Sequence, residues 1–440
     1  MLKRPIGIIF LLSVLFTFTL SAQVTSVSPY SRFAVGDLLP QTFTRSLGMG
    51  SASMGLATPL NVDITNPASY HNLRLTTFEA GMEFSLLQQQ QADPPFNISN
   101  NTSGFRFLTF GIPLTDWWGT AAGLKPYSFK GYNINTQRRL AADTNVVIND
   151  NFTGEGGINR VFWGNSFKLA EGFSLGVNFS YLFGPLSESA RVDFDDNTFL
   201  DTRSSIETNV SGILLEYGAQ YTYHLSNNSF IGVGLSLANS SNLNADFNQY
   251  QYTLEGNQPV DTLKGGVTQQ GTLTLPSEFR AGFSFGKNHP NLLNPAWALN
   301  FDFENYAGSQ FRDAQGAAPL VDGYTLQLGG FFMPRYTFSR LERSPGYFNN
   351  IEYRFGAYYE NTPLSLAGMQ ITDYGITFGL GLPIRQKSPA PGEVKISTLN
   401  IGARLGRRGT LQNNLIQEEY LNIYIGITLN DKWFIDYKYR

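Results

Sequence analysis

Apolar residues alternate with small or polar residues along most of this chain, with a period of two. In residues 173–181 every odd position is Phe, Leu, Val or Tyr, and every even position is Ser, Gly or Asn. Residues 297–303 and 421–429 follow the same pattern, interrupted in the second segment only by Tyr424. Successive side chains of a strand point to opposite faces, so the alternation predicts strands with one apolar and one polar face.

About fifteen segments are strand candidates on this criterion. A bacterial barrel built from one chain has an even number of strands, so one candidate is in excess and we expect about fourteen. The candidates lie near 76–87, 104–114, 118–130, 157–168, 172–183, 208–225, 229–238, 274–286, 296–307, 322–333, 349–360, 371–382, 395–405, 419–429 and 432–440.

A soluble β-sandwich also alternates, but three further features favour a transmembrane β-barrel. The segments run for roughly nine to eleven residues, the length of a tilted membrane strand. They continue along almost the whole chain, and aromatic residues such as Trp117, Trp118 and Trp433 recur near their ends, as in interfacial girdles. The fold class expected is therefore all-β, an antiparallel barrel.

The N-terminus has the pattern of a secretion signal. Lys3 and Arg4 precede an apolar stretch at 6–20, and Leu20-Ser21-Ala22 offers a small-residue cleavage site. The apolar stretch is short for a membrane span of about 20 residues. After it there is no apolar run of roughly 18 residues, and only helices and closed barrels satisfy the backbone in lipid. We expect a signal peptide at 1–22, a mature chain from Gln23, and insertion into the outer membrane of a Gram-negative bacterium.

Composition narrows the function classes. Aromatic residues make up 14% and charged residues 15% of the chain, and there are 44 Gly, a mixture that suits strands facing lipid. The formal net charge of -3 argues against nucleic acid as a partner, because such partners need a basic surface. The absence of Cys excludes disulfides, thiolate metal sites and Cys nucleophiles.

The connections fall into two kinds. Tight polar turns at 169–172, 226–228 and 430–432 are typical of the periplasmic end of a barrel. Long polar stretches are typical of outward loops, and Pro383, Pro389 and Pro391 mark one of them as irregular. The long stretches lie at about 131–156, 184–207, 239–273, 307–321 and 383–394.

Residues 23–75 do not alternate well and are rich in small residues, which allow close backbone packing. Such a segment before a barrel indicates a plug inside the lumen, and the alternative is a periplasmic tail. Within it, Gly48, Gly50, Ala52, Gly55 and Asp63, followed by Asn66-Pro67-Ala68, resemble the N-terminal hatch of the FadL/TodX hydrocarbon-transport barrels.

Two further stretches extend this resemblance. Residues 272–282 with Trp297, Asp302 and Tyr306 are similar to a later part of the same family, and 433–440 resemble the terminal strand of Bacteroidota outer-membrane proteins. The resemblance implies a fourteen-stranded barrel at 76–440 closed by a hatch at 23–75. It implies passive uptake of hydrophobic compounds with lateral release through the wall. Some similar barrels serve protein secretion or assembly instead.

The sequence offers little enzyme chemistry. The three histidines, His71, His224 and His289, lack metal-ligand spacing. Residues 223–227 faintly resemble the His-x-Ser-Asn of outer-membrane phospholipase, but no partner for a triad is visible and a strand end with a polar turn explains them. Acidic pairs such as Asp195-Asp196 suit solvated loops, with calcium binding as the alternative. We predict no catalytic residue, no metal site and no cofactor.

Charges on the polar face of the strands are a candidate lumen site. Glu79, Glu83, Asp302 and Glu304 all fall on that face, and Arg32 and Arg45 lie in the hatch-like segment. Pairs between these two sets would hold a plug in place while permitting movement. The alternative is a hydrated lumen wall with no specific partner, because barrel interiors are polar in any case.

Three functions are compatible with these observations. The first is passive transport of small hydrophobic molecules, indicated by the hatch motif of Gly48, Gly50, Gly55, Asn66, Pro67 and Ala68. The second is a non-enzymatic accessory barrel in an envelope protein complex for assembly or secretion, indicated by the charged lumen and long polar loops. The third is an outer-membrane hydrolase, which rests on His224 alone.

Overall fold

The computed structural model describes residues 27–141, 145–196, 198–266, 268–289, 295–316, 319–334, 346–387 and 394–432. Most of these residues lie in antiparallel strands. The strands are β1 (Asp37–Leu38), β2 (Thr76–Gln91), β3 (Phe96–Pro113), β4 (Trp118–Arg139), β5 (Val147–Ala170), β6 (Phe173–Phe194), β7 (Asp201–His224), β8 (Ser229–Ala238), β9 (Ser241–Glu255), β10 (Gln258–Lys264), β11 (Thr268–Leu275), β12 (Glu278–Asn288), β13 (Pro295–Tyr306), β14 (Gly323–Phe332), β15 (Glu352–Leu366), β16 (Met369–Lys387), β17 (Val394–Gly409) and β18 (Gln417–Asp431).

The helical elements are short, with three to six residues each. They are η1 (Pro29–Arg32), α2 (Thr44–Leu47), η2 (Pro67–Asn72), η3 (Ser226–Asn228), η4 (Gly308–Gln310), η5 (Tyr347–Asn350) and η6 (Gln412–Asn414). Across the described ranges, no helix is long and apolar enough to cross a membrane.

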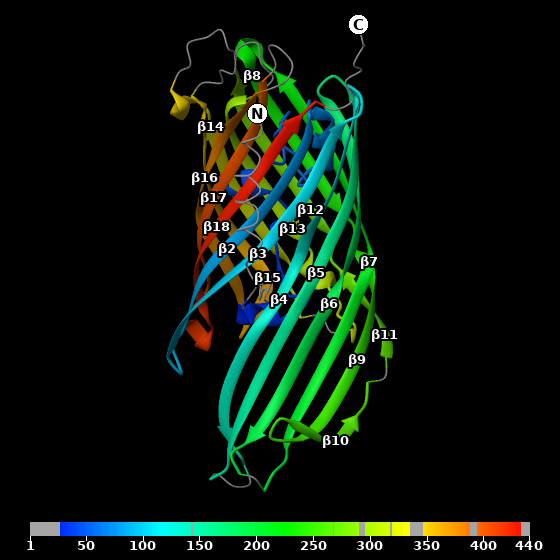
Figure 1. The fold of residues 1–440 in the computed structure, drawn as a ribbon, viewed down its shortest axis with the longest axis vertical. Helices are drawn as coiled ribbons and strands as arrows, with labels where there is room; N and C mark the ends of the chain where they lie inside the picture. The colour runs from blue at the N-terminus through cyan, green and yellow to red at the C-terminus, as the bar shows by residue number, and fades with distance from the viewer. Residues whose placement is uncertain are drawn as a thin grey trace, which may run out of the picture.

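The strands form a closed barrel, because β18 pairs with β2 from Gln417 opposite Gln90 to Asp431 opposite Thr76. The strand β8 runs on into β9, and β11 into β12, across short breaks. Because β1 and β10 lie outside the ring, the wall has fourteen strands (Figure 1). The expected count is confirmed. Fourteen sequence candidates coincide with wall strands, whereas 433–440 of the last candidate lie outside the described residues.

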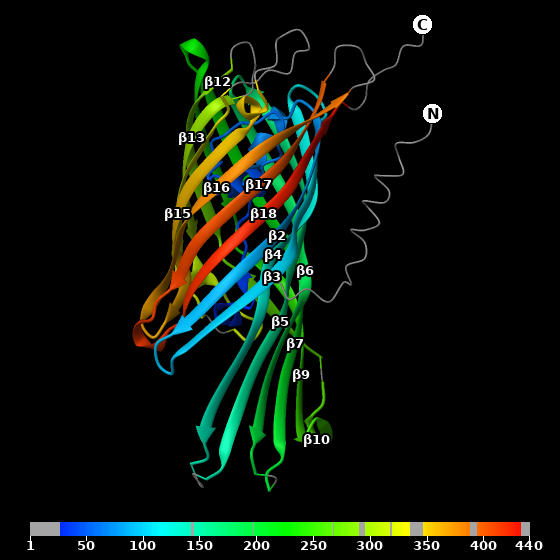
Figure 2. The ribbon, with the colours of Figure 1, turned by 60° about the vertical axis from the view of Figure 1, so that its left-hand side comes forward.

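Part of the wall projects well beyond the rest. The strands β4 to β7 contain 22 to 24 residues, about twice the length that crosses a bilayer. Their distal halves, together with β9 and β10, form a sheet that stands clear of the barrel mouth in both views (Figures 1 and 2). We call this sheet the extension; it consists of 128–139, 147–157, 184–194, 201–211 and 241–264.

The outward face of β7 changes character at one point. Its odd positions from Tyr223 to Ile213 are Tyr, Ala, Leu or Ile, whereas those from Ser211 to Arg203 are Ser, Asn, Glu or Arg. A face in contact with lipid must be apolar. The lipid-facing belt therefore ends between Ile213 and Ser211, and the extension lies outside the membrane.

The inward face changes in the opposite sense at the same level. In β6 the inward Ser174, Asn178 and Ser180 are buried and polar. Beyond Gly184 and Pro185 the inward side chains become largely apolar, at Leu186, Ala190, Val192 and Phe194. The extension thus has a polar outer face and an apolar inner face, as expected for a sheet that no longer borders lipid.

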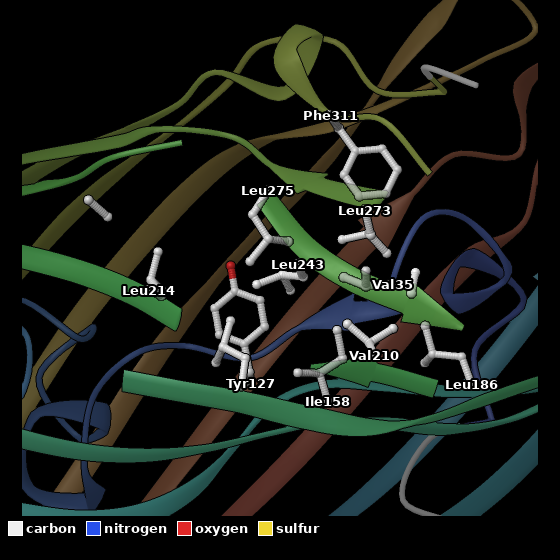
Figure 3. Packing of buried hydrophobic residues seen from close by; sticks show 13 residues of the cluster. Val35, Tyr127, Ile158, Leu186, Val210, Leu214, Leu243, Leu273, Leu275 and Phe311 are labelled. Carbon is white, nitrogen blue, oxygen red and sulfur yellow. The ribbon is translucent and has the colours of Figure 1, made fainter. Parts of the chain in front are cut away.

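An apolar cluster fills the barrel where the extension begins. Ile158, Val210 and Leu243 of the wall pack against Val35, which comes from the N-terminal segment, and Phe311, which follows η4 (Figure 3). Val210 is almost fully buried and Phe311 is completely so. This cluster fixes the base of the extension.

The wall is split between β3 and β4. These strands pair only from Leu108 opposite Leu124 to Pro113 opposite Gly119. Toward the extension, β3 pairs with β2 alone, and β4 pairs with β5 apart from a short contact with β1. The β2–β3 hairpin diverges from β4 in both views (Figures 1 and 2). We call the gap between 96–107 and 127–139 the notch.

The structure corrects the expected loops. Residues 131–156 and 184–207 are mostly strand rather than irregular loop, and 239–273 contain β9 and β10. In the predicted stretch 383–394, residues 383–387 belong to β16 and residue 394 to β17, whereas 388–393 lie outside the described residues. The cause is the change of face described above. Alternation continues beyond the membrane, but the apolar side chains there point inward, and Asn, Ser and Thr interrupt the apolar pattern.

A charge in the lipid-facing belt is expected to destabilise the barrel far more than a charge on the extension. We predict that Phe179→Arg, near the middle of the belt on β6, lowers the free energy of unfolding by about 2–4 kcal/mol. The matched control Ser189→Arg, on the outer face of the same strand beyond the belt, changes it by less than about 0.5 kcal/mol. Urea unfolding in lipid vesicles, followed by Trp fluorescence, measures both; equal losses would show that the belt boundary is misplaced.

Candidate functional site

The N-terminal segment, residues 28–75, lies inside the barrel and we call it the inner segment. It enters near Glu418, whose carboxylate accepts a hydrogen bond from the Ser28 hydroxyl at 2.7 Å. It then reaches β4, three strands further round the wall from β18, where β1 pairs with β4, Asp37 opposite Phe129. From α2 to η2 it occupies the half of the lumen away from the extension and is almost entirely buried.

The backbone of the inner segment touches the backbone of the wall at glycines. A β-carbon on Gly329 would overlap the carbonyl of Met49, and one on Gly234 would overlap the carbonyl of Met54. Only a residue without a side chain permits such an approach. The wall glycines in this position form a belt around most of the barrel: Gly119, Gly176, Gly232, Gly234, Gly329, Gly356 and Gly379. Gly218 and Gly426 complete the belt against the side chains of Asn66, Pro67 and Thr44.

Glycines of the inner segment make the matching contacts. Gly48 packs against Gly379, and Gly50 packs against the backbone at Leu328 and Ala357 with a φ of 64°. Gly55 lies against the carbonyl of Gly232. The glycines picked out by the sequence motif are therefore contact points with the wall, which is a reason for their spacing that requires no ligand.

The Asn-Pro-Ala part of the motif caps η2 and links the inner segment to the wall. Asn66 accepts a hydrogen bond from the Ala68 amide at 3.1 Å. Its side-chain amide donates to the carbonyl of Met54 at 3.1 Å and to that of Ala219 on β7 at 3.0 Å. One side chain thus holds the turn, the inner segment and the wall in register.

Carboxylates of the wall anchor the inner segment through its backbone. Asp302 on β13 accepts hydrogen bonds from the amides of Ser53 at 2.7 Å and Met54 at 2.8 Å. Glu79 on β2 accepts from the Val62 amide at 3.3 Å and the Asn61 side chain at 3.0 Å. Buried bonds to charged acceptors are among the stronger ones in proteins.

The predicted ion pairs between the wall and the inner segment are wrong in their partners. The prediction paired Glu79, Glu83, Asp302 and Glu304 with Arg32 or Arg45. Arg45 pairs with Glu352 of β15 at 3.0 Å. Glu83 pairs with Arg106 of the wall at 3.1 Å, and Glu304 lies 3.4 Å from Arg280. Arg32 stacks over the ring of Phe152, 5.1 Å from its centroid.

The physical reason for this difference is proximity within the wall. Cross-strand neighbours on the inward face are only about 5 Å apart, so Glu83 and Glu304 pair with arginines of the wall. Glu352, in contrast, reaches the inner segment at Arg45. The sequence reasoning omitted Arg106, Arg280 and Glu352. Their inward positions follow from the alternation, but their pairing depends on strand register.

A cavity of about 320 Å³ lies between the inner segment and the wall, on the side of the extension. Its lining is mixed. Apolar side chains include Phe33, Leu39, Phe105 and Phe129, and the charged ones are Asp37, Glu83, Arg106, Glu278, Arg280, Asp302, Glu304, Glu360, Asp373, Arg404, Arg408 and Glu418.

Arginine and tyrosine side chains stack along one wall of this cavity. Arg404 lies 3.7 Å from the ring centroid of Tyr358, and Arg408 lies 4.9 Å from that of Tyr30. The hydroxyl of Tyr420 donates to Asp373 at 2.6 Å. Among the side chains that the structure describes, Nε of Arg404 and Nη2 of Arg106 are buried without a hydrogen-bond partner.

The cavity reaches the notch. Phe105 of β3 and Phe129 of β4 line it from the two sides of the split wall. The inner segment covers the edge of β4 at this place: the Leu39 amide donates to Tyr127 at 3.1 Å, and Ser31 exchanges hydrogen bonds with the backbone of Gly131. The short strand β1 therefore stands where a wall neighbour of β4 would otherwise pair.

Burial shifts the pKa of two ionisable groups of the inner segment. Burial raises the pKa of Asp63, whose carboxylate accepts a hydrogen bond from the Thr65 amide at 3.0 Å. Burial also lowers the pKa of His71, which contacts the Ala68 carbonyl. Within the described ranges, no group of three or more His, Asp or Glu residues is placed to hold a metal ion.

The chain was compared with known proteins. A family model described as BamG matches residues 1–440. The long-chain fatty acid transport protein of Escherichia coli (strain K12) is 24% identical over 405 residues, covering 81% of this chain and 85% of that protein. The corresponding protein of Shigella flexneri matches to the same extent.

Two solved structures share the fold. A Pseudomonas aeruginosa FadL homologue superposes with a TM-score of 0.55 and 12% identity, over 90% of this chain and 99% of the other. The Pseudomonas putida toluene transporter TodX superposes with a TM-score of 0.52 and 13% identity, over 93% and 100%. At these identities the likeness establishes the FadL-like barrel fold.

Filling the contact at one wall glycine is expected to disturb the whole barrel. We predict that Gly329→Ala costs about 1–3 kcal/mol through overpacking against Met49. Gly402→Ala is the matched control, because its nearest neighbour would be Tyr424 Cδ2 at 3.5 Å, an ordinary contact. Urea unfolding and the folded band on unheated gels measure both; a Gly329→Ala barrel as stable as the control would contradict backbone contact at this position.

Loss of the Asp302 carboxylate is expected to loosen the inner segment locally. We predict that Asp302→Ala leaves the amides of Ser53 and Met54 without their acceptor, at a cost of about 2 kcal/mol. Hydrogen exchange at residues 49–56 should accelerate, whereas Glu304→Ala, which removes no bond to the inner segment, should leave it unchanged. Equal exchange in the two variants would refute the anchoring role of Asp302.

Proposed function

The chain belongs to the BamG family, and from this premise we propose that it is an outer-membrane β-barrel for passive transport of small hydrophobic molecules. The observation that carries the proposal is the cavity that extends from the barrel mouth to the split in the wall. Relatives named as transporters of long-chain fatty acids and of toluene support the substrate class.

Transport in this barrel must leave the axis. The inner segment fills the half of the lumen away from the extension, and its backbone touches wall glycines around most of the circumference. A molecule that entered the mouth would reach the cavity and stop there. The notch offers the way out, because pairing between β3 and β4 ends at Leu108 and Leu124, at the edge of the lipid-facing belt.

We assign the gating role to β1. It occupies the edge of β4 through Asp37 and Leu38, and the ion pair of Asp37 with Arg408 at 2.7 Å holds it from inside the barrel. Displacement of β1 would connect the cavity with the lipid between Phe105 and Phe129. An apolar molecule would then pass sideways into the membrane, driven by its own transfer from water to lipid.

The charged part of the cavity restricts this proposal. A purely apolar molecule would have to lie beside guanidinium and carboxylate groups, which gain nothing from such contact. The guanidinium groups of Arg106 and Arg404 in the cavity lining favour a molecule that carries at least one hydrogen-bond acceptor besides its apolar part.

A second function is favoured by the extension. A transport barrel needs strands only as long as the membrane is thick, and four strands of this chain are about twice that length. An accessory barrel in an envelope protein complex would use such a sheet for contacts with another protein. In that case the charged lumen would be a structural filling and no ligand would pass.

We further propose the division of the chain into a signal peptide at 1–22, a hatch at 23–75 and a barrel at 76–440. The export signal rests on the charged and apolar pattern of the first 22 residues. The hatch role rests on the burial of the inner segment. Intact-mass measurement of the mature protein checks the first point, since cleavage after Ala22 leaves Gln23 as its first residue.

A disulfide across β1 and β4 tests transport. Leu38 and Ser128 are direct cross-strand partners, within reach of a disulfide when both are Cys, and the chain has no other Cys. We predict that the Leu38→Cys/Ser128→Cys barrel takes up a fluorescent fatty acid at least about tenfold more slowly when oxidised than when reduced, because β1 can then no longer leave β4.

The matched control places the disulfide where no movement is required. Ser187 and Glu207 are cross-strand partners on β6 and β7 in the extension, and their Cys pair should leave uptake unchanged in both redox states. Uptake that is as fast without the protein as with it would reject transport and favour the accessory barrel. Uptake that depends on the protein but not on the β1 disulfide would reject the gating role alone.

A further inference from the structure

Among the described residues, the edge of β4 beyond the inner segment pairs with no other strand. The contact with β1 ends at Phe129, and Ser31 caps the backbone of Gly131. From Asn133 to Gln137, among the described residues, β4 pairs with β5 alone. Backbone groups of a strand alternate between its two edges, so the amides and carbonyls of Asn133, Asn135 and Gln137 face the notch, as those of Gly131 do.

This edge lacks the protection that exposed edges ordinarily carry. Native proteins block such edges with Pro, Lys or other charged residues. The opposite edge of the extension follows that rule: β10 carries Pro259, Asp261 and Lys264. In contrast, residues 133–137 of β4 read Asn-Ile-Asn-Thr-Gln, with no Pro and no charge.

The faces on either side of this edge define what fits there. The inner face beside it carries Ile134 and Phe152, continuous with the apolar inner face of the extension. The outer face carries Asn133, Asn135 and Asn151, which hydrogen-bond one another through their side chains. A strand added to this edge would need apolar residues toward the inner face and uncharged polar residues toward the outer face.

We propose that residues 133–137 of β4 are an acceptor for an extended segment of a different protein at the cell surface, which adds to the extension as a further strand. Main-chain hydrogen bonds give such strand addition its affinity, and alternate side chains give its specificity. The site lies outside the membrane, beyond the level where the outer face of β7 becomes polar. It is separate from the transport cavity and does not depend on it.

A second copy of this chain does not fit. Two β4 edges that paired antiparallel would point the two barrels in opposite directions, which one membrane forbids. Parallel pairing of the same two edges would turn one inner face to the outer side and set Ile134 among asparagines. The charge-free composition likewise gives no reason for a nucleic acid or a charged lipid headgroup to bind.

Amide hydrogen exchange in native membranes tests the proposal without knowledge of the partner. In outer membranes from the producing cell, the amides of Asn133, Asn135 and Gln137 should exchange at least about tenfold more slowly than in the purified monomeric barrel. The internal control is β10, residues 258–264, whose exchange should be the same in both samples. Equally fast exchange of residues 133–137 in both would overturn the proposal.

Equally slow exchange in both samples would also overturn the proposal, because residues of this chain itself would then protect the amides of β4. A third result, protection that persists only in a purified homodimer, would identify a second copy and reject a different protein. Tandem mass spectrometry with site resolution separates these amides from their neighbours, and native mass measurement separates monomer from dimer.

A pair of substitutions at one position provides the matched test. Asn135→Pro removes an edge amide that no described residue pairs with, and Pro is tolerated at such positions. We expect it to raise the exchange of Asn133 and Gln137 in native membranes to the rate of the purified barrel. Asn135→Ala keeps the amide and should leave the protection in place.

Two measurements distinguish the loss of strand addition from a folding defect. The folded band on unheated gels and uptake of a fluorescent fatty acid should be the same for Asn135→Pro and Asn135→Ala. If the proline variant fails to fold, Gln137→Lys places a charge on the same edge without altering the backbone and should abolish protection equally. Retained protection in a folded variant of either kind would refute strand addition at β4.

Discussion

The contact of backbone with backbone between the inner segment and the wall is the constraint on which the rest of this structure depends. Gly329 and Gly234 have no side chain because the carbonyls of Met49 and Met54 occupy that space. Around this belt, Asp302 and Asn66 supply the polar partners that a buried backbone requires. A segment held at so many points cannot shift by a small movement of one residue.

This constraint decides which functions the barrel can perform. An opening along the axis would require the release of many contacts at once, so any transport must use the cavity and the notch. The notch exists because β3 and β4 stop pairing at Leu124 on the side of the extension, and β1 pairs with β4 there instead. The same break in the wall thus supports a lateral exit inside the membrane and a free strand edge outside it.

The extension is the part of the wall that stands clear of the lipid-facing belt. The change from an apolar to a polar outer face at Ile213 and Ser211 marks the end of the membrane, and beyond it the inner face becomes the apolar one. Such a sheet resembles one layer of a soluble domain. In soluble domains the apolar face of a sheet is buried against a second layer. Val35 and Phe311 cover its base, and Arg32 lies over the ring of Phe152.

Much of the barrel could be read from the sequence, since alternation in 173–181 or 421–429 is a local property that any strand expresses. The fourteen strands, the all-β class and the polar character of the lumen followed from it. The length of β4 to β7 did not, because beyond Pro185 the apolar positions pass from odd to even numbers and look like a polar loop. The shift of the apolar positions from odd to even numbers is itself visible in the sequence, and it predicts that the strands continue into the extension.

The sequence by itself determined which side chains face lipid and which glycines cluster in the hatch motif, because both are set by neighbours along the chain. Only the tertiary structure decided which groups meet. Arg45 meets Glu352, and Asp302 meets the Ser53 and Met54 amides, because strand register and the path of the inner segment place them within a few ångströms. Register is a property of the closed barrel, and no local pattern encodes a contact between residues some three hundred positions apart.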